Sequence, residues 1–268
     1  MYDTTEKFNS LKSESVVTVL GIESSCDETA AAVVVNGRDI RSNVIASQVP
    51  VHRRFGGVVP EVASRNHTMA VNNVVDEALK TAGVTIADID AIAVTYGAGL
   101  VGALLVGVTA AKALSYATGI PLVKVNHIEG HVAANFAAFP DLEPPFLALV
   151  ASGGHTLILD VAGYNDYKCL GSTRDDAIGE AFDKTARLLG LPYPGGPEID
   201  RLAKKGKNNI SFFHDKKSVN DDFSLSYSGL KTAVVNPGYL LTQLFTTSGR
   251  TWEKVTYFCQ LFLPLGML

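Results

Sequence analysis

Cysteine is scarce in this chain, and positive charge is not in excess. Its 268 residues include three widely spaced cysteines, Cys26, Cys169 and Cys259, which fit neither a disulfide framework nor a zinc-binding pattern. The net charge is −4 and the isoelectric point is near 5.9, so no global positive field attracts nucleic acid. Any RNA must be held by a local basic patch or by a partner. These features favour a protein of the reducing cytoplasm.

The N-terminal residues lack the apolar core of a signal peptide and the Arg-rich pattern of a transit peptide. We expect residues 1–15, which are polar and mixed in charge, to be disordered. Residues 91–111 contain no charged side chain and could span a bilayer by length. However, Tyr96-Gly97-Ala98-Gly99 interrupts this run, and a buried strand at 89–96 followed by a helix at 100–117 explains both halves. We therefore expect no membrane span.

Hydrophobic periodicity predicts two α/β lobes, and the chain has enough apolar residues (47%) to bury one large core or two modest ones. The predicted elements of the first lobe (16–143) are strands at 16–22, 29–35, 41–49, 89–96 and 121–126 and helices at 60–82, 100–117 and from about 127. After Pro144-Pro145, the second lobe (144–236) should contain strands at 146–152, 155–163 and 167–173, a helix at 177–190, and another that opens near Gly195. Ligands of such repeated α/β lobes bind in a cleft where loops at strand ends converge.

The second lobe is expected to be incomplete. A helix that begins in SGLKTAVVN (228–236) is stopped by Pro237-Gly238, and residues 237–268 form an apolar tail without helix or strand periodicity. Such a tail would expose apolar surface.

Two histidines four residues apart, His127 and His131 in NHIEGHVAA, would lie on one face of a helix and could share a metal ion such as zinc or iron. A third ligand would still be needed, and Glu129 points away from both. The motif is not His-Glu-x-x-His, so a zinc protease would lack its general base. A surface or capping position for this histidine pair is the alternative.

A first polar turn, Glu23-Ser24-Ser25-Cys26-Asp27-Glu28-Thr29, connects two predicted strands. Its carboxylates Asp27 and Glu28 could organise water or a metal, or accept an amine substrate. A solvated hairpin turn is the alternative. Cys26 is a weak candidate nucleophile, because neither a helix N-terminus nor a basic neighbour is present to lower its pKa.

A second turn, Val150-Ala151-Ser152-Gly153-Gly154, offers two glycines where the backbone can approach a phosphate-bearing ligand. The next helix carries Asp183, and a further glycine turn is followed by Gly196 and Asp200. The two carboxylates could accept hydrogen bonds from ribose hydroxyls, and Gly196 adds a flexible backbone. The alternatives are an ordinary Gly-Gly hairpin and an ion pair of Asp183 with Arg187.

Three basic clusters could touch RNA phosphate or could be ordinary solvated surface. They are His52-Arg53-Arg54, Arg65-Asn66-His67 and Lys204-Lys205-Gly206-Lys207.

Seven blocks, in order between Val16 and Asn236, together resemble the tRNA N6-adenosine threonylcarbamoyltransferase family of the bacterial TsaD type. The blocks are GIESSCDETAAAVV (21–34), FGGVVPEVASRNH (55–67), GAGLVGALLVG (97–107), NHIEGH (126–131), SGGHT (152–156), GEAFDKTARLLGLPYPGGPEIDRLA (179–203) and FSLSYSGLKTAVVN (223–236). The resemblance implies the duplicated actin and sugar-kinase-like fold. It also implies transfer of a threonylcarbamoyl group from threonylcarbamoyl-AMP to the N6 amine of the adenosine 3′ to the anticodon, in tRNAs that read codons starting with A.

The resemblance further implies roles for the candidate residues. The histidine pair would bind Fe2+ or another divalent ion such as zinc, the second turn with Asp183, Gly196 and Asp200 would line the adenylate site, and Asp27 and Glu28 would lie beside the transferred group. A paralogous partner subunit and a small ATPase are implied as well.

The resemblance ends at Asn236, as in a truncated or frameshifted reading frame. The family's later glycine-rich segment and the Asp that completes the metal site have no counterpart here. Two rival functions remain. One is an ATP-dependent kinase or ATPase, which would use carboxylates and magnesium in place of the histidine pair, and the other is an inactive fragment.

Overall fold

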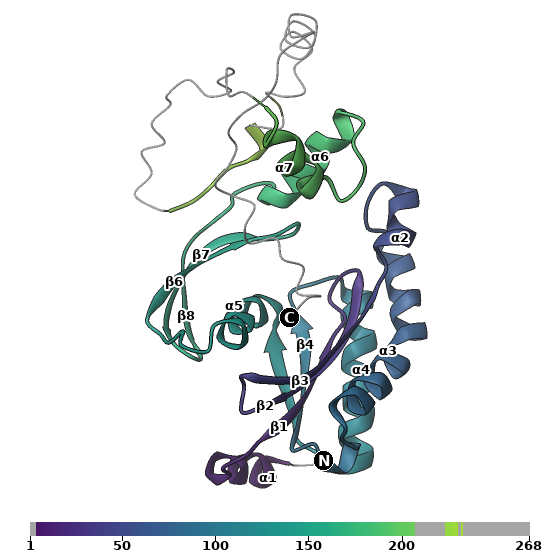
Figure 1. Ribbon diagram of the computed structural model, residues 1–268, viewed down its shortest axis with the longest axis vertical. Coiled ribbons are helices and arrows are strands. Elements are labelled where there is room, and N and C mark those ends of the chain that lie inside the picture. Colours follow the sequence, from purple (N-terminus) through teal and green to yellow (C-terminus); the bar gives the residue numbers. More distant parts are fainter. Residues whose placement is uncertain (1–3, 207–222, 230–231, 233–268) are drawn as a thin grey trace, which may run out of the picture. The chain divides into compact units, whose positions relative to one another are not determined.

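A computed structural model describes residues 4–206, 223–229 and 232. These residues divide into two compact units, unit 1 up to Glu143 and unit 2 from Pro144 (Figure 1). The division falls at the Pro144-Pro145 pair, where the sequence predicts a boundary. Several predicted features lie outside the described residues, namely Lys207, most of the helix in SGLKTAVVN, the apolar tail 237–268 and Cys259 within that tail.

A mixed sheet forms the centre of unit 1. Within the described residues its strand order is β3-β2-β1-β4-β5, in which β1 pairs antiparallel with β2 and parallel with β4, and β4 pairs parallel with β5. The strands are β1 (Thr18–Glu23), β2 (Glu28–Val35), β3 (Asp39–Ser47), β4 (Ala91–Gly97) and β5 (Leu122–Asn126). The helices are α1 (Thr5–Ser10), α2 (Val49–His52), α3 (Pro60–Ala82), α4 (Val101–Thr118) and α5 (His127–Ala138), with 3-10 turns at Leu11–Ser13, Arg53–Phe55 and Ile86–Asp88.

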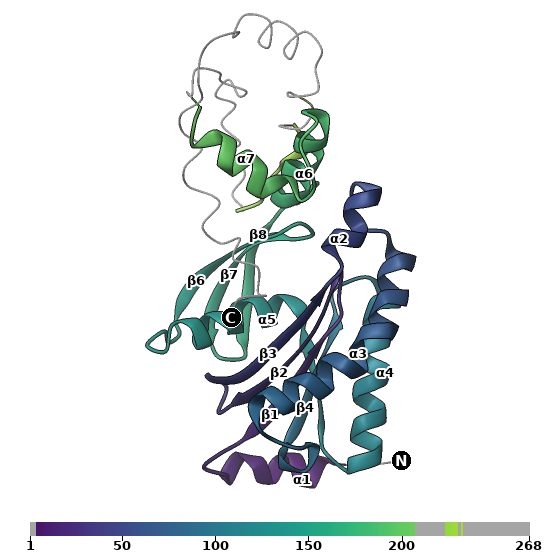
Figure 2. The ribbon, with the colours of Figure 1, turned by 45° about the vertical axis from the view of Figure 1, so that its right-hand side comes forward.

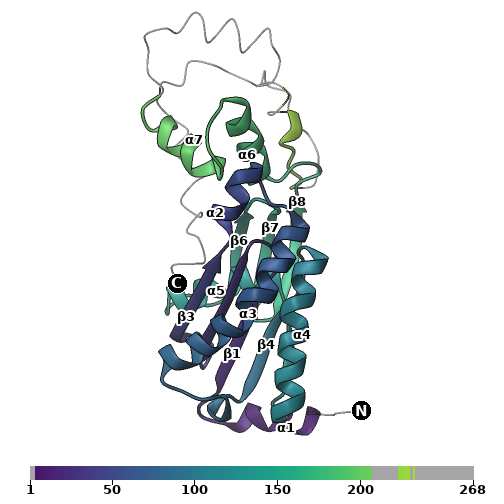
Figure 3. The ribbon, with the colours of Figure 1, turned by 90° about the vertical axis from the view of Figure 1, so that its right-hand side faces the viewer.

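The core of unit 1 lies between one face of this sheet and two helices, α3 and α4, which run side by side across it (Figures 1 and 3). Alternate residues of a strand point to the same face, which explains why Leu20, Ile22 and Val33 are almost fully buried. Val71 and Val74 of α3 are spaced for one helical face and pack into the same layer. Helix α5 lies on the other side of the sheet (Figure 1). The core therefore leaves the ends of the strands free to carry polar groups.

Residues 5–13 are helical, which corrects the prediction that residues 1–15 are disordered. Helix α1 continues directly into the 3-10 turn at Leu11–Ser13. The hydroxyls of Ser10 and Ser13 each donate to a carbonyl three residues earlier, and Lys7 Nζ donates to Gly119 O at 3.3 Å, beyond the end of α4. Low hydrophobicity predicted disorder, but these local bonds and the contact with Gly119 order a polar segment.

The charge-free stretch forms β4 followed by α4, as predicted. In the part of the chain that the structure describes, α4 is the one helix long and apolar enough to cross a membrane by length and composition alone. It packs against α3 and β4, and its buried residues include Ala103, Gly107 and Ala111. Burial accounts for one face of α4 only, because Val101, Leu105 and Tyr116 are exposed.

Gly107 allows α4 to approach the end of β1. A Cβ at this position would lie 2.5 Å from Ser24 Oγ, which donates to Ala103 O at 2.9 Å and accepts from the Gly107 N–H at 3.2 Å. The Gly107→Ala substitution should therefore lower the free energy of unfolding by about 1–3 kcal/mol, measured by urea denaturation, even though alanine is the better helix former.

Gly130→Ala on α5 is the matched control, because among the described residues no atom outside the adjacent helix backbone lies within 4 Å of the added Cβ. This substitution should raise the free energy of unfolding by about 0.5–1 kcal/mol through helix propensity. If Gly107→Ala and Gly130→Ala stabilised the protein equally, the close contact between a Cβ at position 107 and Ser24 Oγ would carry no cost, and the prediction would be wrong.

Unit 2 begins with an antiparallel sheet, which has the order β6-β7-β8 in the described residues. Its strands are β6 (Phe146–Ala151), β7 (Thr156–Gly163) and β8 (Asp166–Ser172), and they are followed by α6 (Ile178–Leu188) and α7 (Gly195–Ala203), which pack against each other (Figure 2). Each unit thus contains three consecutive strands that pair antiparallel, β1 to β3 in unit 1 and β6 to β8 in unit 2. The predicted α/β class and its repeated strand programme are confirmed.

Asp175 anchors the described part of the FSLSYSGLKT block to unit 2. Its carboxylate accepts hydrogen bonds from the hydroxyls of Ser226 and Ser228 and from the main-chain N–H groups of Tyr227 and Ser228. Although burial acts in the opposite direction, these bonds hold the pKa of Asp175 well below its usual range.

Candidate functional site

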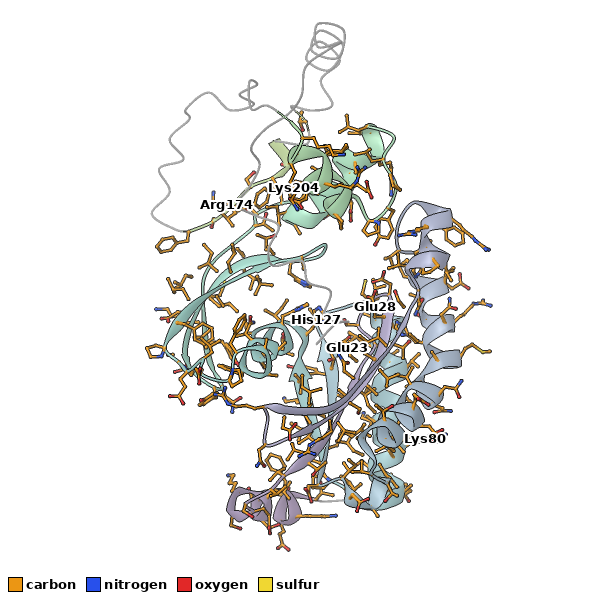
Figure 4. All side chains as sticks on the ribbon, in the orientation of Figure 1. Glu23, Glu28, Lys80, His127, Arg174 and Lys204 are labelled. Atoms are coloured by element: carbon orange, nitrogen blue, oxygen red, sulfur yellow. The ribbon has the colours of Figure 1, made fainter. Side chains whose placement is uncertain are left out.

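The ends of three parallel strands bring polar residues together in unit 1. Glu23 ends β1, Thr95 lies near the end of β4, and His127 directly follows β5. Because the carboxyl ends of parallel strands meet at one edge of a sheet, side chains from distant parts of the sequence converge there. Glu23, Glu28 and His127 lie close to one another at this edge (Figure 4).

The histidine pair occupies the first two turns of α5. The side chain of Asn126 caps the helix by accepting from the Ile128 N–H at 2.9 Å, so the helix begins at His127 itself. The Nε2 atoms of His127 and His131 lie 2.9 Å apart, with the ring planes at 79°. Two imidazole nitrogens that face each other at this distance share either one proton or one metal ion.

Glu23 holds His127 in place. Its Oε2 lies 3.3 Å from His127 Nδ1 and accepts from the Thr95 hydroxyl at 2.7 Å, while its Oε1 accepts from the Ser25 main-chain N–H. Ser25 Oγ also lies 3.1 Å from His127 Nδ1. Burial alone would raise the pKa of Glu23, but the bonds from His127, Ser25 and Thr95 lower it to about 2. An ionised carboxylate therefore favours the imidazole proton on Nδ1, which leaves Nε2 of His127 as the acceptor that faces His131 Nε2.

This arrangement fits a divalent metal ion. Metal-bound histidines usually donate their second N–H to a carboxylate, which is the relation between His127 and Glu23. The two Nε2 atoms face each other at 2.9 Å, so both imidazoles could offer a lone pair to one ion. No third ligand completes the group among the described His, Cys, Asp and Glu residues. We call His127 and His131 the half-site, because together they could supply two ligands; that they bind a metal ion stays a prediction.

The first turn is tightly held behind this half-site. Ser24 and Ser25 are both almost fully buried, and the Ser25 carbonyl accepts from the Leu100 N–H at 2.8 Å. Gly99 has a positive φ of 155°, and a Cβ on it would lie 2.6 Å from the same carbonyl. Only glycine fits there without displacing the turn.

Asp27 and Glu28 form a pair of acidic groups at this turn. Asp27 is buried, and Ser47 Oγ donates to Glu28 Oε1 at 3.2 Å. Burial and the neighbouring Asp27 carboxylate raise the pKa of Glu28 to about 7, so Glu28 can exchange a proton near neutral pH. Desolvation and the same carboxylates raise the pKa of Cys26 to about 12, which disfavours a thiolate nucleophile.

In unit 2, the second turn is joined to the start of α6. Ser152 O accepts from the Gly179 N–H at 3.0 Å, and a Cβ on Gly179 would lie 2.6 Å from that oxygen. Gly153 and Gly154 are exposed, and apart from their chain neighbours no atom of the described residues lies within 4 Å of a Cβ built on either of them. The turn therefore offers an open backbone beside a helix N-terminus, which suits a phosphate-bearing ligand.

Asp183 links α6 to α7. Its Oδ1 accepts from the Gly195 N–H at 2.6 Å, and a Cβ on Gly195 would lie 3.0 Å from the Asp183 Cα. Gly196 follows in the first turn of α7, whereas Asp200 lies further along the helix and pairs with Lys204 at 2.8 Å. Asp183 and Gly196 thus lie close together, while one carboxylate oxygen of Asp200 is engaged with a surface lysine.

Comparison with known proteins identifies the family. The family sequence model for TsaD, tRNA N6-adenosine threonylcarbamoyltransferase, matches residues 39–257. The tRNA N6-adenosine threonylcarbamoyltransferase of Clostridium perfringens strain SM101 is 61% identical over 218 residues, which is 81% of this chain and 64% of the relative. The chain belongs to this family.

A second TsaD relative, from Clostridium novyi, is 61% identical over 225 residues, which cover 82% of this chain and 65% of the relative. The chain thus spans just under two thirds of the length of the curated relatives that it matches. Among solved structures, component A of (R)-2-hydroxyglutaryl-CoA dehydratase from Acidaminococcus fermentans is 12% identical, with a TM-score of 0.47 over 85% of this chain and 68% of that chain. YeaZ from Pseudomonas aeruginosa is 17% identical, with a TM-score of 0.38 over 57% and 64%.

The geometry explains what several TsaD-family blocks do in this chain. The GAGLVGALLVG block supplies Gly99 and Gly107, whose missing side chains make room for Ser25 and Ser24. The GIESSCDET block supplies Glu23, a partner of His127 that the sequence did not reveal. Glu23 ends β1, and β5 precedes the NHIEGH block. The carboxylate could have been recognised as a partner of His127 only if the strand order had been known, because that order brings the ends of β1 and β5 to one edge.

Two of the basic clusters are not uniform surface patches. His52 and His67 are fully buried, which corrects their grouping with phosphate-binding side chains, whereas Arg53, Arg54 and Arg65 are exposed. The imidazoles are buried because the helices that carry them pack their inner faces against the first turn. Arg65 forms an exposed ion pair with Glu61, and Lys204 pairs with Asp200.

Proposed function

We propose that this chain carries out the family's acyl transfer, moving threonylcarbamoyl from threonylcarbamoyl-AMP to the N6 amine of the adenosine 3′ to the anticodon. The observation that carries this proposal is the carboxylate-anchored histidine pair in a chain of the TsaD family. In this reaction the amine attacks the carbamoyl carbon, the bond from that carbon to the phosphate oxygen breaks, AMP leaves, and the amine loses one proton. A cytoplasmic location follows from the tRNA substrate.

His127 and His131 would hold the metal ion, Fe2+ or another divalent ion such as zinc. When bound, the ion supplies positive charge that can polarise a carbonyl or neutralise a phosphate. Glu23 orients His127 for this task, and Thr95 in turn orients Glu23. Unit 1 would therefore supply the positive charge for this reaction.

Unit 2 would hold the adenylate. The second turn, Val150 to Gly154, presents open main-chain atoms to the phosphate, and Ser152 is kept in position by its bonds with His155 and Gly179. Gly196 would allow close approach to the nucleotide, and Asp183 and Asp200 would accept the ribose hydroxyls. For Asp183 this requires the oxygen that is not bonded to Gly195.

Asp27 and Glu28 would lie beside the transferred group, and Glu28 would accept the proton that the N6 amine loses. The pKa of Glu28, raised to about 7 by burial and by Asp27, suits a general base near neutral pH.

The reaction rate should therefore rise with pH as Glu28 ionises, with a midpoint near pH 7. Because the carboxyl pKa is raised, the base form is lost below this pH and is fully present above it. In the Glu28→Gln variant the rate at pH 8 should fall by about 100-fold, and the midpoint near pH 7 should disappear. The measurement is the single-turnover rate between pH 5.5 and 8.5. An unchanged pH profile in Glu28→Gln would exclude Glu28 as the base.

A paralogous partner subunit and a small ATPase would complete the system and help to hold tRNA, since the chain has a net charge of −4. An exposed apolar face on α4 supports a protein partner, because Val101, Leu105 and Tyr116 are 73%, 58% and 74% exposed. These residues are spaced along one side of the helix, so they would be buried together.

The experiment that tests the function combines the chain with threonylcarbamoyl-AMP, an unmodified tRNA that reads codons starting with A, and the presumed partners. Modified adenosine is measured by mass spectrometry of digested tRNA. Transfer above the level of a reaction without the chain supports the proposal, and omission of each partner shows which are required. Absence of transfer together with ATP hydrolysis by the chain would instead favour the kinase or ATPase alternative.

A further inference from the structure

Two buried imidazoles in unit 1 have no role in the half-site. His52 at the end of α2 and His67 on α3 are each 0% exposed, and both lie near the first turn. Buried histidines without an ion pair are costly unless both ring nitrogens are satisfied. The partners of these nitrogens therefore show what the two residues hold.

His67 joins the two ends of the Asp27-Glu28 dipeptide. Its Nε2 lies 3.0 Å from Cys26 O, and its Nδ1 lies 2.8 Å from Thr29 Oγ1. A carbonyl can only accept, so Nε2 carries the proton, and Nδ1 accepts from the Thr29 hydroxyl. Burial lowers the pKa of His67, which keeps the ring neutral and preserves this donor and acceptor pattern.

His52 supports the same turn through Gln48. Its Nδ1 accepts from the Val59 N–H at 3.3 Å, so Nε2 carries the proton and donates to Gln48 Oε1 at 3.2 Å. The Gln48 main-chain N–H in turn donates to Asp27 O at 2.9 Å. The carbonyls of residues 26 and 27 and the side chain of Thr29 are thus all fixed from α2 and α3.

We propose that His67 is a positioning residue that fixes the Asp27-Glu28 dipeptide for the acyl-transfer reaction, with His52 as its support through Gln48. The proposal rests on the proposed function, since it concerns the carboxylates assigned to the transferred group. Its structural basis is independent of that function, because one imidazole bonds to the residue before the dipeptide and to the residue after it. Thr29 is 1% exposed, so water cannot easily replace the lost partner.

The first test uses hydrogen exchange and requires no activity. The variants are His67→Leu, which removes both bonds, His67→Gln, whose amide can still donate to Cys26 O, and Val74→Ala. Val74 is a buried core residue about two turns further along the same helix, so it reports a loss of stability that originates in the core. Amide exchange is followed by mass spectrometry in peptides that cover residues 24–30 and 45–50.

In His67→Leu, exchange in these peptides should accelerate by about ten-fold or more relative to Val74→Ala, at matched global stability. His67→Gln should restore at least part of the protection. Equal exchange of the turn in His67→Leu and Val74→Ala would overturn the proposal, as would a His67→Gln variant identical to His67→Leu.

The second test measures transfer of threonylcarbamoyl to tRNA in the complete system. His67→Leu should lower kcat by about ten-fold or more and leave the KM for tRNA unchanged. His67→Gln should recover part of kcat. Val74→Ala should keep the wild-type kcat at a temperature where this variant is folded. If wild type shows no transfer, the proposed function fails while the exchange result still decides whether His67 holds the turn. If wild type is active and His67→Leu keeps its kcat, the catalytic part of the proposal is overturned.

Discussion

Replacing His127 by alanine should weaken binding of a divalent metal ion by about 100-fold or more. The proposed metal site has two imidazoles whose Nε2 atoms lie 2.9 Å apart, and the substitution leaves one of them. With one imidazole left, the chelate effect is lost, so the affinity for the ion should fall to that of a single histidine ligand. His131→Ala should have an effect of the same size, because the two rings contribute equivalent ligands.

The measurement is a titration of the metal-free chain with Co2+, followed by its absorption bands, or with Fe2+ under anaerobic conditions by calorimetry. Glu129→Gln is the matched control. Glu129 is exposed on the same helix, two positions from each histidine, and its replacement changes the net charge without touching the half-site. Wild-type affinity in His127→Ala would remove the metal centre from the proposed function.

Replacing Glu23 by glutamine should weaken metal binding by about 10- to 100-fold, although Glu23 need not touch the ion. The three groups that bond to its oxygens, the His127 Nδ1–H, the Ser25 N–H and the Thr95 hydroxyl, all act as donors. A carboxylate accepts from all three, whereas an amide presents its own N–H groups to at least one of them. The unsatisfied contact would free the His127 ring and permit the wrong tautomer.

A spectroscopic readout separates this effect from a simple loss of stability. Nitrogen NMR of the metal-free chain should show His127 protonated on Nδ1 in wild type and in Glu129→Gln, and a mixture of tautomers in Glu23→Gln. Metal affinity is measured in the same samples by the titration used for His127→Ala. An unchanged tautomer together with unchanged affinity in Glu23→Gln would mean that the carboxylate does not orient the ligand.

The sequence by itself determined the order and type of the strands and of the longer helices, but not the short helices α1 and α2. Helix 60–82 was predicted with its observed bounds, because Pro60 can open a helix and Gly83 ends it in the left-handed conformation. The strands before and after the first turn follow from two apolar runs around a polar turn, and the placement of the two histidines on one helix face follows from their four-residue spacing. These features depend on neighbours a few residues apart, which is the range that a linear pattern records.

The tertiary structure alone decided which residues act together. Glu23 and His127 are 104 positions apart, and they meet because β1, β4 and β5 are parallel neighbours whose ends share one edge. His67 was grouped with surface cations because Arg65 and Asn66 precede it, but the turn of α3 points its ring inward to Cys26 and Thr29. The tertiary structure also moves the pKa values of Glu23 and Glu28 in opposite directions, downward for Glu23 and upward for Glu28. Three donors surround Glu23, whereas Glu28 lies beside another carboxylate, and the order of residues along the chain encodes neither environment.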